Sequence, residues 1–114
     1  MTEKQQLDLA TRTLDEHKAE DIASIDVSGA SPFADYVVLA TCQNPRALAA
    51  VADHLEDAFA AAGVEVSARE GEPDSGWIVF LAGSVLVHLM LERNRAELNL
   101  EQFLEQLKDH HLKK

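Results

Sequence analysis

The chain has 114 residues, a length that suits one domain with one hydrophobic core; 46% of the residues are hydrophobic and 26% are charged. Twenty acidic and ten basic residues give a formal net charge of -10. Residues 92–114 hold five acids and five bases, so the whole acidic excess lies in residues 1–91. Such a surface repels phosphate backbones and anionic lipids and attracts basic partners. We therefore expect no direct nucleic-acid specificity and no membrane binding.

The sequence also indicates a cellular compartment. No apolar run reaches the roughly 18 to 20 residues that a membrane helix needs. The N-terminal segment has neither the apolar centre of a signal peptide nor the Arg- and Ser-rich composition of a transit peptide. The single cysteine, Cys42, cannot form an internal disulfide, which fits a reducing compartment. We expect a cytoplasmic location.

The first half of the chain predicts two helices and two strands. Thr2 and Gln5 form the pattern of a capping box before a helix over residues 3–18. A short strand begins at residue 22 and is broken by residues 29–32, and residues 34–41 are rich in β-branched and aromatic residues, which predicts a second strand. Asn44 and Pro45 predict the start of a helix with apolar spacing to residue 62, and Gly63 is placed to end it in a left-handed conformation.

The second half predicts three strands and a last helix. Residues 64–69 form a strand, residues 70–76 a polar loop, and residues 77–81 and 85–91 a β-hairpin with a tight turn between them. Residues 85–91 are apolar at both alternating sets of positions, which predicts a central strand covered on both sides. Asn99 and Gln102 repeat the capping pattern before a final helix, whose apolar stripe comprises Leu100, Phe103, Leu104 and Leu107.

The element order is therefore α-β-β-α-β-β-β-α, which predicts an α/β fold with a five-stranded mixed sheet and helices packed on it. The strand, helix and strand in the middle of the chain predict a crossover between parallel strands. The final hairpin is antiparallel.

The sequence contains few residues in patterns that support catalysis. Cys42 has no local nucleophile signature, the histidines lack metal-ligand spacing, and no glycine-rich phosphate loop is present. Gly83 and Ser84 are similar to the glycine and serine that open a nucleotidyltransferase site, but no carboxylate follows before Glu92 to hold magnesium. We predict no catalytic, cofactor-binding or metal-binding residue. A residual nucleotide-binding or nucleotidyltransferase-like enzyme is the alternative.

His88 lies inside the apolar run of residues 85–91, on one strand face with Leu86 and Met90. No ligand or catalytic partner is near it in sequence. We interpret it as a buried, neutral core histidine that needs a hydrogen-bond partner, such as a backbone carbonyl or an acid from another element.

An ordered series of short segments runs through the chain, namely K-A-E-D-I at 18–22, D-V-S-G at 26–29, A-D-Y-V-V at 34–38, V-A-D-H at 51–54, E-G at 70–71, W-I-V at 77–79, Gly83, V-x-V-H at 85–88, Arg95 and L-E at 100–101. In order and spacing, this series resembles the ribosomal silencing factor family, also called Iojap or RsfS. The resemblance covers about residues 3–104. It implies one silencing-factor domain over residues 1–114 and a nucleotidyltransferase-like fold without the metal site. Residues 105–114 are expected to lengthen the last helix and have no counterpart in the family pattern.

The resemblance also implies a function. Family members bind the large ribosomal subunit through its L-series ribosomal protein number fourteen, sterically block joining of the small subunit and repress translation under nutrient limitation. They are not enzymes, use no cofactor and are often seen as homodimers. A basic ribosomal protein is a partner that the net charge of -10 also favours.

The chain departs from the family pattern at four positions. The family commonly has aspartates where this chain has Leu81 and Ser84, and Tyr and Trp where it has Leu98 and Leu104. We predict a partner-binding surface drawn from Asp35, Tyr36, Arg46, Glu70, Glu72, Trp77, Leu81, Ser84, Arg95 and Leu98.

Structural alternatives stay open for several of these candidates. Trp77 fits core packing as well as a partner-facing anchor, and Asp35 and Tyr36 also fit turn chemistry. Arg46 lies in the first turn of a helix, an unfavourable end for a cation, unless an acid pairs with it. Arg95 could equally neutralise acids of its own chain, and Glu70 and Glu72 also fit a solvated loop.

Overall fold

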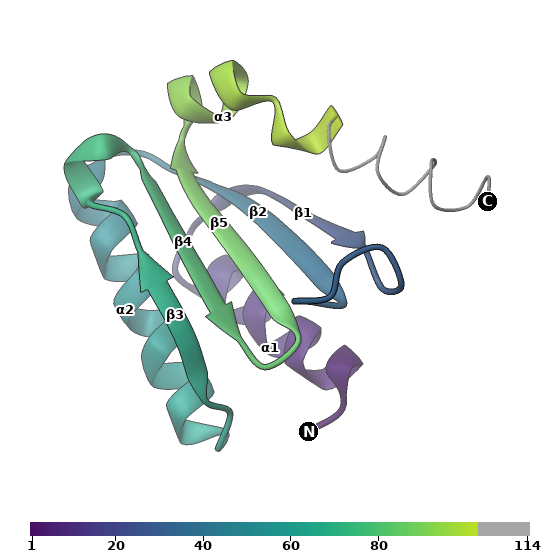
Figure 1. Ribbon diagram of the computed structural model, residues 1–114. Helices are drawn as coiled ribbons and strands as arrows, with labels where there is room; N and C mark the ends of the chain where they lie inside the picture. The colour runs from purple at the N-terminus through teal and green to yellow at the C-terminus, as the bar shows by residue number, and fades with distance from the viewer. Residues whose placement is uncertain (103–114) are drawn as a thin grey trace.

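The computed structural model describes residues 1–102. Its elements are α1 (Glu3–Glu16), β1 (Glu20–Asp26), β2 (Tyr36–Cys42), α2 (Pro45–Ala61), β3 (Val66–Glu70), the 3-10 helix η1 (Pro73–Ser75), β4 (Trp77–Ala82), β5 (Val85–Leu91) and α3 (Glu92–Leu98). The strands form one sheet in the order β1-β2-β5-β4-β3, with α1 and α2 on one face (Figure 1). Within residues 1–102, no helix is long and apolar enough to cross a membrane.

The sheet is mixed, as the sequence predicts. β2 and β5 are parallel, whereas the pairs β1–β2, β4–β5 and β3–β4 are antiparallel. Two antiparallel steps separate β3 from β5, so β3 runs parallel to β2. The segment β2–α2–β3 is therefore a crossover between parallel strands, with β5 and β4 lying between them in the sheet. This confirms the predicted α/β class.

The helix ends follow the predicted local chemistry. The Thr2 side chain accepts from the Gln5 backbone, and the Gln5 side chain accepts from the Thr2 backbone, which completes the capping box. Asn44 caps α2 by accepting from Ala47 N–H at 2.8 Å. Gly63, with φ of 77°, takes the left-handed conformation predicted for it just after α2.

The C-terminal end of the described chain differs from the prediction. Glu92–Leu98 form α3, and the sequence predicts no helix there because this segment has no apolar periodicity. Asn99 ends α3 in a left-handed conformation with φ of 49°, and its Nδ2 donates to Gln102 Oε1 at 2.6 Å. It therefore does not act as the predicted N-cap. Residues 100–102 are helical, while Phe103, Leu104, Leu107 and the 105–114 extension lie outside the described residues.

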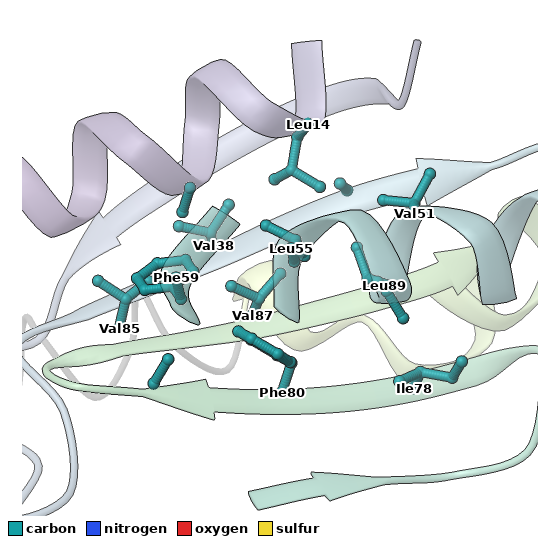
Figure 2. Packing of buried hydrophobic residues seen from close by; sticks show 14 of the residues in the cluster. Leu14, Val38, Val51, Leu55, Phe59, Ile78, Phe80, Val85, Val87 and Leu89 are labelled. Carbon is teal, nitrogen blue, oxygen red and sulfur yellow. The ribbon is translucent and has the colours of Figure 1, made fainter. Parts of the chain in front are cut away.

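The larger core lies between the sheet and the two long helices. Phe59 of α2 and Phe80 of β4 are fully buried there, with ring centroids 5.8 Å apart in a tilted arrangement. Figure 2 shows side chains of both helices meeting side chains from the strands in this layer, among them Leu14, Val38, Val51, Leu55, Ile78, Val85, Val87 and Leu89.

A smaller cluster lies on the opposite face of the sheet. Its buried residues come from β2, β5 and the end of β1, and they are Ile25, Val27, Val37, Leu39 and Met90. Leu100, just after α3, packs against this cluster, as do Trp77 and Leu86. The central strand β5 thus has a fully covered face under the helices and a partly covered face on the other side, where the sequence predicts full cover on both.

Truncating Phe59 tests the larger core. Phe59→Ala removes a fully buried ring and leaves a cavity, so we expect the free energy of unfolding to fall by about 3–5 kcal/mol in urea denaturation. Phe33 is 75% exposed and provides the matched control. Phe33→Ala should change the same quantity by less than about 0.5 kcal/mol. Equal losses in the two variants would contradict this assignment of the core.

Candidate partner-binding surface

β4 and β5 present a partly exposed surface on the side of the sheet away from α1 and α2. Side chains alternate along a strand, and every second residue of the two strands enters the core under the helices. The residues between them are half-buried, except Met90, which is fully buried in the smaller cluster. We call this set the open face: Trp77, Val79, Leu81, Leu86 and His88. In Figure 1 the sheet is seen from this side, with α1 behind the strands.

Trp77 and His88 are joined on the open face. Trp77 Nε1–H donates to His88 Nδ1 at 3.0 Å, and the ring centroids are 5.8 Å apart at an interplanar angle of 27°. An accepting ring nitrogen carries no proton, so the imidazole is neutral with its proton on Nε2. Burial lowers the pKa of His88 to about 4, which favours the same neutral state.

The structure corrects the prediction for His88 in two respects. The ring is neutral and hydrogen-bonded, as the sequence suggests, but it is half-buried on the open face and not enclosed in the core. Its partner is the indole of a neighbouring strand, where the sequence suggests a backbone carbonyl or an acid. Pairing across two strands depends on their register, which the sequence does not show.

Arg95 is held within its own chain. Its Nη1 donates to the Asp21 carbonyl at 2.6 Å and to Thr41 Oγ1 at 2.9 Å, and its Nε donates to Glu101 Oε1 at 2.8 Å. The side chain is only 13% exposed. Asp21 has φ of 49° at an irregularity in the pairing of β1 with β2. The guanidinium thus ties α3 and the following turn to β1 and β2, which supports the structural alternative for this candidate.

Three other candidates, Asp35, Tyr36 and Ser84, meet at the turn between β4 and β5. The Asp35 and Tyr36 N–H groups both donate to the Ser84 carbonyl, at 2.8 and 3.2 Å. The Ser84 N–H and hydroxyl both donate to Gln6 Oε1 of α1, at 2.9 and 2.6 Å. Tyr36 packs against the larger core on the helix side, whereas Leu81, three residues before Ser84, lies on the open face. Asp35 and Ser84 therefore border one end of the open face.

The remaining candidates lie around the other end of the sheet. Glu70 of β3 pairs with Val79, so its side chain is on the same side as the open face, and Glu72 is exposed beside η1. Leu98 is 39% exposed at the end of α3. Arg46 is exposed in the first turn of α2, on the helix side. The structure thus brings Trp77, Leu81 and Glu70 to one face, with Asp35 and Ser84 at its border, and it does not bring Arg46 or Tyr36 there.

Three members of the open face, Val79, Leu86 and His88, are absent from the predicted set. The alternation of side chains along the two hairpin strands places these residues on one face, and the sequence shows that alternation. It does not show which of the two faces the helices cover. Phe33, in the loop between β1 and β2, is a further exposed aromatic residue that the prediction omits.

The described residues offer little for metal or nucleophile chemistry. Within residues 1–102, no group of three or more His, Cys, Asp or Glu side chains is arranged to hold a metal ion. Burial raises the pKa of the Cys42 thiol to about 11, so at neutral pH it is a protonated thiol and a poor nucleophile.

Comparison with known proteins identifies the family. A family model described as ribosomal silencing factor during starvation matches residues 1–114. The ribosomal silencing factor RsfS of Zymomonas mobilis is 38% identical over 96 residues, covering 84% of this chain and 72% of that protein. The RsfS of Bacillus subtilis is 30% identical over 102 residues, covering 90% of this chain and 86% of that protein. The chain belongs to the ribosomal silencing factor family, a family of regulatory proteins.

Solved structures show the same fold. A crystal structure of a Chromobacterium violaceum protein superposes with a TM-score of 0.88 at 28% identity, covering 92% of this chain and 88% of that one. A crystal structure of a Bacillus halodurans protein superposes with a TM-score of 0.79 at 27% identity, covering 88% of this chain and 93% of that one. The sheet and helices that build the open face are therefore shared with experimentally determined relatives.

Replacing Arg95 tests the stabilising role of its hydrogen bonds to Asp21, Thr41 and Glu101. Arg95→Lys keeps the charge but cannot reach Asp21, Thr41 and Glu101 together, so we expect unfolding to become easier by about 1–3 kcal/mol. Thermal and urea unfolding measure this change. Arg93→Lys, at an exposed position of the same helix, should change stability by less than about 0.5 kcal/mol. Equal changes in stability in the two variants would contradict this role of Arg95.

The pKa of His88 predicts a pH-dependent contribution to stability. The folded pKa is lowered from 6.5 to about 4, so below pH 6.5 the unfolded chain binds a proton that the folded chain does not. Stability is therefore lost as pH falls from 6.5 toward 4, by at most about 1.4 kcal/mol per pH unit. Between pH 7 and pH 5, wild type should lose about 1–2 kcal/mol more than His88→Asn.

Proposed function

We propose that this protein binds the large ribosomal subunit through its L-series ribosomal protein number fourteen, sterically blocks joining of the small subunit and so represses translation under nutrient limitation. The observation that carries the proposal is the family match across all 114 residues. The action is steric, not enzymatic, and takes place in the cytoplasm. Homodimers of the free protein are part of the same proposal.

We assign the open face as the docking surface. It is a half-buried, largely apolar area of two neighbouring strands, and its single tryptophan belongs to the residue class most enriched at binding hot spots. Asp35 lies at one end of this face, and Glu70 of β3 lies beside Val79 nearer the other end. An apolar centre with acidic ends is complementary to an apolar contact on a basic protein, which fits a ribosomal protein as partner.

The β1–β2 side of the same sheet face is less suited to docking. Leu100 covers the cluster of Ile25, Val37 and Leu39, and Arg95 ties this covering segment down. The partner is therefore expected to contact the β4–β5 side. Surface area that is already buried within the chain cannot contribute to binding.

Co-sedimentation with isolated large subunits tests the proposal. We expect wild type to pellet with the subunits at low salt and to be released as salt is raised, because a basic partner is held partly by charge. Leu86→Glu places a charge on the open face, and we expect it to weaken binding at least tenfold, which corresponds to about 1.4 kcal/mol.

Ala50→Glu supplies the matched control, because it adds the same charge at an exposed position of α2 on the other side of the molecule. It should bind like wild type. Circular dichroism must show that both variants are folded. A wild-type protein that stays in the supernatant would contradict the proposed function, and equal weakening by both variants would contradict the open face as the docking surface.

A further inference from the structure

We propose that His88 is a positioning residue for Trp77: by accepting the indole N–H, it holds the tryptophan ring in one orientation on the open face, ready for the partner. The role in binding rests on the proposed function, whereas the positioning itself is a property of the free protein. The inference begins from the 3.0 Å bond between Trp77 Nε1 and His88 Nδ1.

The register of the hairpin makes this contact specific. Trp77 pairs with Met90, and His88 pairs with Val79, so Trp77 and His88 are diagonal neighbours on one face of β4 and β5. Diagonal neighbours lie about 7–8 Å apart, a distance that only long or aromatic side chains bridge. An indole and an imidazole span it, and their hydrogen bond joins the two rings at an interplanar angle of 27°.

The bond changes what Trp77 offers to a partner. A half-buried indole with an unbonded N–H must keep a water molecule or find a polar group on the partner. Here His88 takes up the N–H, so the exposed part of the ring is an apolar surface. Fixing the ring before binding also reduces the conformational entropy lost on association, which is the physical basis of preorganisation.

The surroundings keep His88 in the accepting state. β4 and β5 carry no other ionisable side chain, and the side chains of β2 beside it are Val37, Leu39 and Thr41. Among residues 1–102, the ionisable groups on this side of the sheet include Glu70 of β3, Asp35 beside the β4–β5 turn, and Arg95, which is bonded to Thr41 and Glu101. Burial of the ring keeps it neutral at physiological pH, which leaves Nδ1 free to accept.

Three substitutions of His88 separate positioning from simple packing. In His88→Asn, the amide Oδ1 takes the place of Nδ1 and can accept from the indole, but it cannot be protonated. His88→Leu removes the acceptor and keeps an apolar side chain. His88→Gln keeps a polar side chain of similar length but moves its acceptor toward the position of Nε2, and it serves if the leucine variant is poorly folded.

Trp77 is the only tryptophan, so one indole N–H signal in a nitrogen-15 spectrum and one fluorescence emission report directly on it. We expect indole N–H exchange with solvent to rise about tenfold or more in His88→Leu and His88→Gln, and to stay within about threefold of wild type in His88→Asn. In wild type the indole signal should shift as the pH falls from 6 to 4, and in His88→Asn it should not. Unchanged exchange in both His88→Leu and His88→Gln would overturn the proposal.

Co-sedimentation of the same variants with large subunits then tests the consequence for binding. We expect His88→Leu and His88→Gln to bind at least fivefold more weakly than His88→Asn, which keeps the acceptor for the indole. If wild type binds and all three variants bind equally, the role of the positioned ring in docking is overturned while the proposed function stands. If wild type does not bind but the indole readout behaves as expected, the proposed function fails and the positioning of Trp77 is upheld.

Discussion

The alternation of side chains along β5 is the constraint on which the rest of the structure depends. β5 is the middle strand, parallel to β2 and antiparallel to β4, and Val85, Val87 and Leu89 all point into the core under α1 and α2. Leu86 and His88 are therefore forced to the opposite face. A shift of β5 by one residue would move its core side chains to the opposite face and expose them. The burial of one face therefore determines which residues lie on the other.

The two faces of the sheet are completed in different ways. On the helix side, α1 and α2 cover the larger core, in which Phe59 and Phe80 are fully buried. On the opposite side, the segment of residues 92–102 packs Leu100 against the β1–β2 half and is anchored through Arg95. The β4–β5 half keeps its apolar side chains partly accessible. A surface of this kind is suited to binding another protein, and the family is one of ribosomal silencing factors.

The chemistry of the described residues agrees with a binding surface. The buried Cys42 thiol is held in its protonated form, and the depressed pKa of His88 keeps a neutral imidazole that accepts a hydrogen bond instead of exchanging protons near neutral pH. A perturbed histidine is often read as a catalytic group. Here the same perturbation has a different use, because the ring organises the neighbouring tryptophan.

The sequence by itself determined the class of fold, the caps at Thr2, Asn44 and Gly63, and the family, because these depend on local patterns and on an ordered series of segments. It did not predict α3, whose residues show no apolar period. Only the tertiary structure decided which side of the hairpin is left open, that Arg95 is engaged internally, and that the indole of Trp77 meets His88. These features join segments far apart along the chain, and their geometry follows from strand order and register, which no local pattern specifies.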